Sequence, residues 1–386
     1  MGEPVERRFL IVAGEASGDL HASRLVAALR ELGPCRVRGI TGSALEQAGA
    51  ERVVAAEELA VIGFSAIVPR LPRLWRAYRR MLDEFERFRP HACILVDAPG
   101  FNLRLGPALK RRGARIFYYI APQVWAWHAE RAAHMAAWAD RLGVVFPFEE
   151  RLFRDAGVNA TYVGHPLLDD LAPEVGEAEL RRELGIGPER RIVGLLPGSR
   201  AQELRHHWPI MLRAARLLRE RRPDLLFVTA LAGPPGEALR ERLSPGQGGR
   251  PSDPELRVVS GRTRAVQKHA RVCAVASGTA TLETALFGTP LAIVYRVGRL
   301  NYAIARRVIR LERIGLPNIV VGEEVAPELL QDRFTPEALA ATLARWLDDE
   351  REHASMRAGL ARVRQKLGAP GASRRAATVA WQLAGG

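Results

Sequence analysis

The sequence has few cysteines and no long apolar run. Its three cysteines, Cys35, Cys93 and Cys273, lie far apart and follow no metal-ligand spacing. Such sparse cysteine argues against a disulfide framework and indicates a reducing compartment, with buried, inert thiols as the simplest interpretation. The first apolar run, residues 9–13, is too short for a signal peptide, and no run reaches the roughly 20 apolar residues of a membrane-spanning helix. We therefore expect a cytoplasmic protein, either soluble or peripherally bound to a membrane.

Familiar ligand motifs are missing as well. The nine histidines show no H-E-x-x-H or comparable spacing, so the sequence predicts no metal site. Neither the G-x-G-x-x-G fingerprint nor the G-x-x-x-x-G-K-[ST] loop occurs, so nothing indicates a dinucleotide or P-loop cofactor. We expect no cofactor.

What the chain has in excess is positive charge. Lys and Arg number 57 against 43 Asp and Glu, a net charge of +14, in a chain that is 47% hydrophobic. The hydrophobic content is that of a folded protein. The charge predicts an anionic partner, which is nucleic acid, a membrane surface or a phosphorylated substrate.

Apolar runs alternate with helical patterns along both halves, which predicts parallel sheets joined by right-handed crossovers. At 386 residues the chain fits two domains of about 150 to 200 residues each. We expect an α/β protein with two doubly wound, Rossmann-like domains, residues 1–168 and 186–350, facing across a cleft. Residues 351–386 form a helical segment that is able to pack back on the first domain. The predicted strands are residues 9–13, 92–97, 114–120, 141–146, 191–196, 225–230, 272–276 and 291–295.

Two strand–loop–helix turns in the second half carry the clearest binding signal. They are VGLLPGSRAQEL at residues 193–204 and AVASGTATLE at residues 274–283. Unpaired N–H groups and the positive end of the helix dipole make each helix start suited to an anion. Gly198 and Gly278 allow close approach of a ligand to the backbone, and Arg200 adds a fork of donors suited to phosphate. The pair predicts a diphosphate clamp, with Glu283 one helical turn farther on and able to bind a ribose.

In the first half, two strand ends carry polar turns. GEASGD, residues 14–19, is either an anion- or hydroxyl-binding turn or a structural one, and we expect Asp19 to cap a helix over residues 20–32. Asp97 lies at the carboxyl end of the strand at residues 92–97, on the edge of the sheet where ligands bind. It is either a general base or a helix-capping residue. Position alone does not separate these roles.

Aromatic residues and a histidine follow the next strands. Trp125, Trp127 and His128 belong either to the core or to the wall of an acceptor pocket. His165 is either a hinge residue or a ligand contact.

Residues 61–80 combine apolar and aromatic residues with closely spaced arginines. This composition suits a helix lying in an anionic lipid interface. An ordinary amphipathic helix with a solvated basic face is the alternative, and a nucleic-acid contact is a weaker third because no known binding module accompanies it. The residues of interest are Val61, Phe64, Arg73, Trp75 and Arg76.

Taken together and in order, these turns resemble one known family. AGEASGD, DAPGFN, YYIAPQVWAW, PFEE, VGHPLLD, LLPGSR, SGTATLETAL, LPNIV and PELLQ are similar to motifs of the lipid-A-disaccharide synthases. These enzymes are inverting glycosyltransferases of the two-domain GT-B architecture. The resemblance runs from residue 13 to about residue 331.

The resemblance implies a reaction and a set of roles. The donor would be UDP-2,3-diacylglucosamine and the acceptor 2,3-diacylglucosamine 1-phosphate (lipid X), joined in a β-1′,6 linkage with release of UDP, a step of lipid A and lipopolysaccharide biosynthesis. Asp97 would be the general base. The stretch at residues 61–80 would face the anionic inner membrane, and a homodimer is compatible with the family. UDP would be held by Gly198, Ser199, Arg200, Ser277, Gly278, Thr279, Glu283, Asn318 and Gln331, and the acceptor by Gly14, Glu15, Ser17, Trp127 and His165.

Three alternatives remain at this stage. Another GT-B enzyme, such as the glycosyltransferase of peptidoglycan precursor synthesis or a UDP-sugar epimerase, would share the clamp but not DAPGFN or the WAW stretch. A nucleic-acid-binding protein would explain the charge but leave the clamp without a purpose, so we expect no nucleic acid partner. A nucleotide-sugar sensor would bind UDP and be indifferent to Asp97→Ala.

Overall fold

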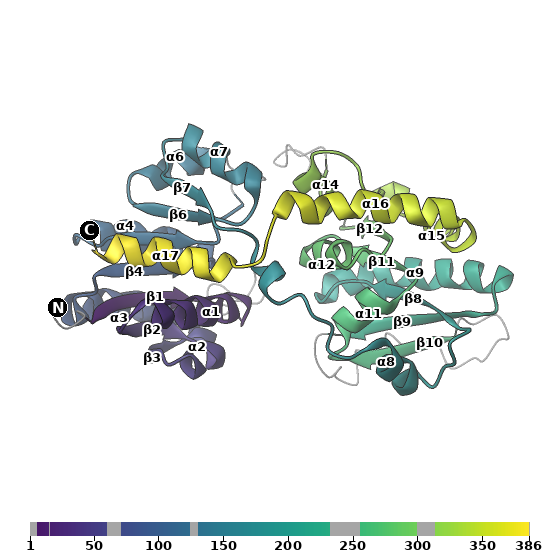
Figure 1. Cartoon of the computed structure of the whole chain (residues 1–386), viewed down its shortest axis with the longest axis horizontal. Helices are drawn as coiled ribbons and strands as arrows, with labels where there is room; N and C mark the ends of the chain where they lie inside the picture. Colours follow the sequence, from purple (N-terminus) through teal and green to yellow (C-terminus); the bar gives the residue numbers. More distant parts are fainter. Residues whose placement is uncertain are drawn as a thin grey trace. The chain divides into compact units, whose positions relative to one another are not determined.

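The computed structural model describes residues 6–14, 16–59, 71–123, 130–231, 255–298 and 313–385. The chain forms two units. Unit 1 comprises Met1–Asp170 and Ala369–Gly386, and unit 2 comprises Leu171–Gly368 (Figure 1). Each unit is a parallel sheet with helices on both faces.

Unit 1 contains a seven-stranded parallel sheet in the order β3-β2-β1-β4-β5-β6-β7. The central strand β4 (Ala92–Val96) reads ACILV and is buried at every position. Such continuous apolar runs are typical of parallel strands that are covered on both faces. The other strands are β1 (Arg7–Ala13), β2 (Cys35–Thr41), β3 (Glu51–Ala55), β5 (Ile116–Tyr119), β6 (Arg141–Val144) and β7 (Ala160–Tyr162).

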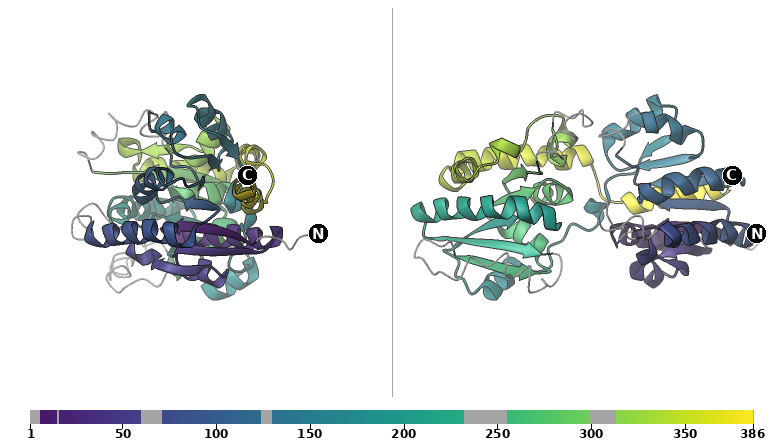
Figure 2. Two further views of the ribbon diagram at one scale, coloured as in Figure 1. Left: turned by 90° about the vertical axis from the view of Figure 1, so that its left-hand side faces the viewer. Right: turned by 180° about the vertical axis from the view of Figure 1, so that it is seen from behind.

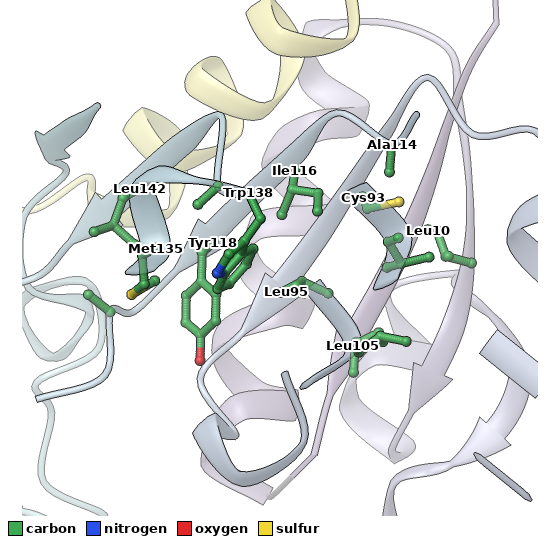
Figure 3. Close-up of a cluster of buried hydrophobic side chains, with 14 of the residues drawn as sticks. Leu10, Cys93, Leu95, Leu105, Ala114, Ile116, Tyr118, Met135, Trp138 and Leu142 are labelled. Carbon is green, nitrogen blue, oxygen red and sulfur yellow. The ribbon is translucent and has the colours of Figure 1, made fainter. Parts of the chain in front are cut away.

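Helices pack on each face of this sheet. Leu10, Leu95, Tyr118 and Trp138 belong to the core of one face (Figure 3). Residues of helices α3, α4, α6 and α7 pack into the same core. Helices α1 and α17 lie side by side on the opposite face (Figure 2). The helices are α1 (Ala16–Leu32), α2 (Ser43–Gln47), α3 (Leu71–Phe88), α4 (Pro99–Lys110), α6 (Glu130–Ala136), α7 (Pro147–Asp155) and α17 (Ala372–Gly385), with short 3-10 turns η1 (Ala56–Glu58) and η4 (Pro166–Asp169).

Unit 2 contains a six-stranded parallel sheet in the order β10-β9-β8-β11-β12-β13. Helices α9 and α15 cover one face around a core that includes Trp208, Phe227 and Phe334. The strands are β8 (Arg191–Leu196), β9 (Leu225–Leu231), β10 (Leu256–Ser260), β11 (Val272–Ala276), β12 (Leu291–Tyr295) and β13 (Glu328–Leu330). The helices are α8 (Glu177–Leu184), α9 (Ala201–Arg221), α11 (Thr263–His269), α12 (Thr279–Phe287), α14 (Leu316–Val321), α15 (Pro336–Asp348) and α16 (Glu350–Leu367), with a 3-10 turn η5 (Gln331–Arg333).

The end of the chain divides differently from the prediction. Helix α16, which we expected in a separate segment over residues 351–386, packs within unit 2 against α12, α14 and α15. Helix α17 alone joins unit 1. It presents fully buried alanines, Ala376, Ala377 and Ala380, to the fold, and small side chains allow a helix to pack closely. Unit 2 also begins earlier than residue 186, because α8 packs on α11.

Helix α17 is held at its start by Asp169. The carboxylate of Asp169 accepts hydrogen bonds from the amides of Gly371 (2.6 Å), Ala372 (3.1 Å) and Ser373 (2.9 Å), and from the Ser373 hydroxyl (3.0 Å). Burial raises the pKa of Asp169, but these hydrogen bonds outweigh it and lower the pKa overall. Asp169, in the VGHPLLD motif, therefore caps the N-terminus of the last helix through its side chain.

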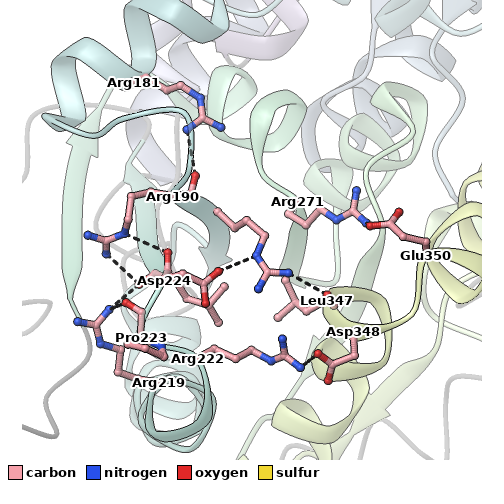
Figure 4. Close-up of polar contacts among 12 residues, drawn as sticks. Arg181, Arg190, Arg219, Arg222, Pro223, Asp224, Arg271, Leu347, Asp348 and Glu350 are labelled. Carbon is pink, nitrogen blue, oxygen red and sulfur yellow. Dashed lines mark hydrogen bonds and ion pairs between the residues drawn. The ribbon is translucent and has the colours of Figure 1, made fainter.

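Two arginines of unit 2 are bound within the fold. At the beginning of the strands, Arg191 contacts Asp224 (2.7 Å) and the carbonyl of Leu347 (2.9 Å). Arg222 pairs with Asp348 nearby (Figure 4). These contacts tie the end of α15 to the strands β8 and β9, so these two arginines serve the structure of unit 2.

Candidate active site

The two sheets each have a point where the strand order reverses. In unit 1 the reversal lies between the neighbouring strands β1 and β4. The helices that follow them, α1 and α4, lie on opposite faces of the sheet. Ligands of doubly wound folds bind outside the carboxyl ends of such strands. Gly14 follows β1 and Asp97 follows β4, so the two turns meet here. A Cβ on Gly14 would lie 2.8 Å from the Cβ of Ala98, which only glycine avoids.

The turn after β4 holds Asp97 in an unusual backbone conformation. Asp97 and Ala98 both have positive φ angles, 47° and 45°. Each such residue costs on the order of 1–3 kcal/mol and persists only where its surroundings enforce it. The enforcing contacts meet the carbonyl of Asp97, which accepts from the Tyr118 hydroxyl at 2.6 Å and from Nδ2 of Asn102 at 2.8 Å.

Tyr118 and Asn102 hold the Asp97 turn, and the sequence analysis named neither of them. Asn102 closes the DAPGFN motif and is fully buried in α4. Tyr118 lies on β5 within the YYIAP motif, and burial, with a further contribution from the charge of Asp97, raises the pKa of its hydroxyl. A neutral hydroxyl is therefore retained as the donor. Motif membership was the available signal for both residues.

The other expected acceptor residues are placed unevenly. Ser17 is exposed in the first turn of α1. His165 is the N-cap of η4, where Nδ1 accepts from the Leu167 amide at 3.2 Å. Burial, helped by the charge of His21 and opposed by Asp169, lowers the pKa of His165 to about 3, so its imidazole is neutral. Glu15 and Trp127 lie outside the described residues, as do Trp125 and His128.

Asp19 does not cap the helix in which it lies. The helix α1 begins at Ala16, earlier than predicted, and Asp19 is buried within it. Its carboxylate accepts from the amides of Gly42 (2.7 Å) and Ala44 (2.9 Å), at the start of α2. The prediction failed because a capping residue can serve a helix that is close in space rather than its own.

In unit 2, the order reverses between β8 and β11, whose helices α9 and α12 lie on opposite faces. The loops that follow these strands are the two turns of the expected clamp. Gly198 has a φ of +102° and Gly278 a φ of +154°, conformations that favour glycine. The fold therefore brings the two turns to one edge of the sheet.

The two helix starts differ in what their amide groups contact. At α12, Gly278 and Thr279 are exposed, and a Cβ on Gly278 would meet nothing within 4 Å. At α9, the amides of Ser199 and Arg200 donate to Oε2 of Glu203 at 3.1 and 3.2 Å. Glu203 was not among the predicted site residues, although a glutamate at the third helical position is the signature of a capping box.

Several other expected nucleotide contacts are engaged within unit 2. The hydroxyl of Ser277 donates to the carbonyl of Ile314 at 2.9 Å. Glu283 lies 3.3 Å from the guanidinium of Arg264. With its amide assigned in the favourable orientation, Gln331 exchanges two hydrogen bonds with the backbone of Val297, at 3.2 and 3.3 Å.

Asn318 occupies a place different from the expected one. It is fully buried, and its Nδ2 donates to the Ala326 carbonyl (2.7 Å) and to Glu328 (2.8 Å), while Oδ1 accepts two amides. Glu328 in turn accepts the amides of Ile314 (3.0 Å) and Gly315 (2.9 Å). Asn318 thus holds the LPNIV turn in place, with both polar atoms of its side chain bonded within unit 2.

His207, another residue that sequence analysis missed, joins two loops at this edge. Its Nδ1 lies 2.7 Å from the Pro197 carbonyl, and its Nε2 accepts from the Arg296 amide at 2.9 Å. Burial lowers the pKa of His207, and the two backbone contacts only partly oppose it. The imidazole is therefore neutral, and its two contacts connect the loop after β8 to the loop after β12.

A mixed aromatic and basic surface lies on α3. Leu71 and Trp75 are 52% and 55% exposed, although both are large and apolar. The Trp75 ring stacks on Tyr78 at 5.6 Å, and the guanidinium of Arg79 lies 5.2 Å from the Trp75 ring centre. Tyr78 reaches Phe101, at the start of α4 in the Asp97 turn, with ring centres 6.4 Å apart. Arg73 and Arg76 are exposed on the same helix, and Val61 and Phe64 lie outside the described residues.

The described residues lack both a membrane-spanning helix and a cluster of metal ligands. None of the helices in those ranges is at once long enough and apolar enough to cross a membrane. Within the same part of the chain, no group of three or more His, Cys, Asp or Glu side chains is arranged to hold a metal ion.

Comparison of the whole chain with solved structures defines its class. UDP-GlcNAc 2-epimerase from Neisseria meningitidis bound to UDP-GlcNAc superposes with a TM-score of 0.62 at 9% identity, covering 98% of this chain and 99% of that one. The glycotransferase of kitacinnamycin gives 0.65 at 16% identity, covering 98% and 100%. At such low identity these likenesses show the fold alone. Two parallel-sheet α/β units with loops at both reversal points thus form a GT-B fold.

Sequence comparison identifies the family within this class. The model of the lipid-A-disaccharide synthetase family matches residues 9–382. The lipid-A-disaccharide synthase of Geobacter metallireducens is 41% identical over 387 residues, covering 100% of this chain and 99% of the relative. The chain belongs to the lipid-A-disaccharide synthase family and is a glycosyltransferase.

Proposed function

We propose that this glycosyltransferase transfers 2,3-diacylglucosamine from its UDP donor to the 6-hydroxyl of 2,3-diacylglucosamine 1-phosphate. The products are the β-1′,6-linked disaccharide 1-phosphate and UDP. The proposal rests on family membership together with the two strand-order reversals, one in each unit, whose loops carry the family's motifs. Unit 1 would bind the acceptor and unit 2 the donor.

The donor's diphosphate is assigned to the loops after β8 and β11. Gly278 and Thr279 are exposed residues at the start of α12, and the Arg200 side chain is 82% exposed. Helix starts and arginine stabilise the negative charge that grows on the leaving group as the glycosidic bond breaks. Glu283, which lies 3.3 Å from the guanidinium of Arg264, would accept hydrogen bonds from the ribose.

Asp97 is assigned as the general base. The acceptor oxygen forms a bond to the anomeric carbon while its proton passes to the Asp97 carboxylate. The bond between the anomeric carbon and the UDP oxygen breaks, UDP leaves with the electron pair, and the anomeric carbon is inverted. A well-placed base contributes about 10²- to 10⁴-fold to the rate. The strained turn supports this assignment because such strain is concentrated at functional sites.

The α3 surface is assigned to a membrane interface on the cytoplasmic side. Trp75 and Leu71 would enter the interface, while Arg73, Arg76 and Arg79 meet anionic headgroups. Because α3 contacts α4 through Tyr78 and Phe101, this surface lies beside the Asp97 turn. That neighbourhood suits substrates whose acyl chains stay in the membrane while their sugars reach the site.

The observation that carries the proposal is the meeting of the family's motifs at the reversal point of each sheet. The test is UDP release from UDP-2,3-diacylglucosamine in mixed micelles containing a chelator, with and without 2,3-diacylglucosamine 1-phosphate. We expect release only with the acceptor present, and a disaccharide product. Acceptor-independent release, or an epimerised sugar, would contradict the proposal.

A further inference from the structure

The loop after β8 already holds an anion, and it comes from the protein itself. Oε2 of Glu203 accepts the amides of Ser199 and Arg200, and Oε1 lies 3.1 Å from Nη1 of Arg200. A single carboxylate thus engages two amides and the guanidinium of the loop that the proposed function assigns to the donor's diphosphate.

Gly198 provides the space for this arrangement. Its φ is +102°, and a Cβ there would lie 2.2 Å from Oε2 of Glu203 and 2.9 Å from its Cβ. The lack of a side chain at Gly198 is what lets an anion lie against the loop. Glu203 fills that space while its own side chain is only 13% exposed.

We propose that Glu203 is a built-in competitor of the donor for the β8–α9 loop. Its carboxylate occupies the phosphate position in the free enzyme, is displaced by the diphosphate of the donor, and returns as UDP leaves. This inference rests on the proposed function, in which the same loop binds UDP. As a consequence, the enzyme binds UDP less tightly than it would without the Glu203 carboxylate in the loop, and UDP is released more readily after the reaction.

The alternative is that Glu203 only caps α9. A cap that keeps the amides of Ser199 and Arg200 while UDP is bound does not compete with the diphosphate, so removing its charge would leave UDP affinity unchanged. The pairing with Arg200 separates the two ideas, because a cap needs the backbone amides alone. Replacing the carboxylate by an amide keeps an acceptor for the amides but removes the charge that holds Arg200.

The experiment is titration calorimetry of the full-length protein with UDP and with uridine, for wild type, Glu203→Gln and Glu220→Gln. Glu220 is exposed near the far end of α9 and serves as the charge-matched control. We expect Glu203→Gln to bind UDP about three- to tenfold more tightly, the order expected for losing one charge-assisted contact to the competitor. Uridine affinity and the Glu220→Gln values should equal those of wild type. The inhibition constant for UDP in turnover should fall by the same factor.

Unchanged or weaker UDP binding by Glu203→Gln overturns the inference, as does equal tightening for uridine. Either result leaves the proposed function intact, provided that wild type binds UDP and turns over. Failure of the wild-type protein to bind UDP at all would overturn the proposed function together with the inference. A thermal melt of each variant confirms that the amide preserves the cap.

Discussion

The hydroxyl of Tyr118 donates to the main-chain carbonyl of Asp97 at 2.6 Å. Tyr118 lies on the neighbouring strand β5 and is fully buried, so the packing around its ring fixes the position of its hydroxyl. The carbonyl it holds belongs to a residue with a positive φ, followed by a second such residue. The hydrogen bond from Tyr118 to the main-chain carbonyl of Asp97 therefore helps to fix the orientation of the proposed base.

Removing this hydroxyl should impair turnover more than binding. In Tyr118→Phe, the Asp97 carbonyl keeps Asn102 but loses its shortest contact, so the strained turn relaxes toward ordinary backbone angles. We expect kcat to fall about tenfold, equivalent to about 1.4 kcal/mol, with UDP affinity unchanged. Steady-state kinetics and UDP titration measure both. A fall in UDP affinity equal to the fall in kcat would show a general structural defect instead.

The exposed aromatic end of α3 predicts membrane binding. Trp75→Ala should weaken binding to vesicles containing anionic lipid, because a buried aromatic side chain contributes about 1.5–3 kcal/mol on transfer from water. Vesicle co-sedimentation measures the change. Arg87→Ala, an exposed change near the other end of α3, is the control and should have a smaller effect. Equal effects of the two changes would show that vesicle binding depends on the positive charge of α3 as a whole and not on insertion of Trp75. Binding should weaken with added salt.

The low pKa of buried His165 leads us to expect that the protein loses stability in acid. Its pKa is about 3 in the folded protein and about 6.5 when unfolded. Below pH 6.5 the unfolded chain therefore takes up a proton that the folded protein does not, and the free energy of unfolding falls as the pH drops toward 3. At pH 5 the loss from this residue is about 2 kcal/mol. Urea unfolding at pH 7.5 and 5 measures it.

His165→Asn is the matched control for this pH effect. An asparagine oxygen can accept the Leu167 amide as Nδ1 does, and asparagine is a favoured N-cap. The variant should lose less stability than wild type between pH 7.5 and 5. An identical loss in both proteins would assign the acid sensitivity to other groups, such as His207.

Asp169 predicts the stability of the docked C-terminal helix. Asp169→Ala leaves the first amides of α17 without their acceptor, and loss of an N-cap typically costs about 0.5–2 kcal/mol. We expect a lower free energy of unfolding and faster proteolysis near residues 368–372. Asp83→Ala, an exposed change on α3, should leave both unchanged. Unaltered proteolysis in Asp169→Ala would mean that the buried alanines alone hold α17.

The sequence predicted the architecture because apolar strands such as β4 and β11 are continuous and fully buried. It missed β2 and β3, whose sequences CRVRGIT and ERVVA place charged residues among apolar ones. Both lie toward one edge of the sheet, where charged side chains reach solvent. Short β13 was missed for lack of length.

The candidate site was predicted at the level of loops rather than of side chains. Turn motifs located Asp97 and Arg200 because glycine and helix starts leave a local signature. The partners of those residues depend on contacts between distant strands, such as Tyr118 with Asp97 across 21 positions. Asn318 is buried and bonded within unit 2, which its place in a motif did not indicate.

The central claim, that Asp97 takes the acceptor proton, is tested most directly by single-turnover kinetics of Asp97→Asn with both lipid substrates in mixed micelles. The amide keeps the size of the side chain and removes its basicity. We expect the rate of disaccharide formation to fall by about 10²- to 10⁴-fold while UDP affinity stays at the wild-type value. A rate within a few-fold of wild type would contradict the assignment of Asp97 as the general base.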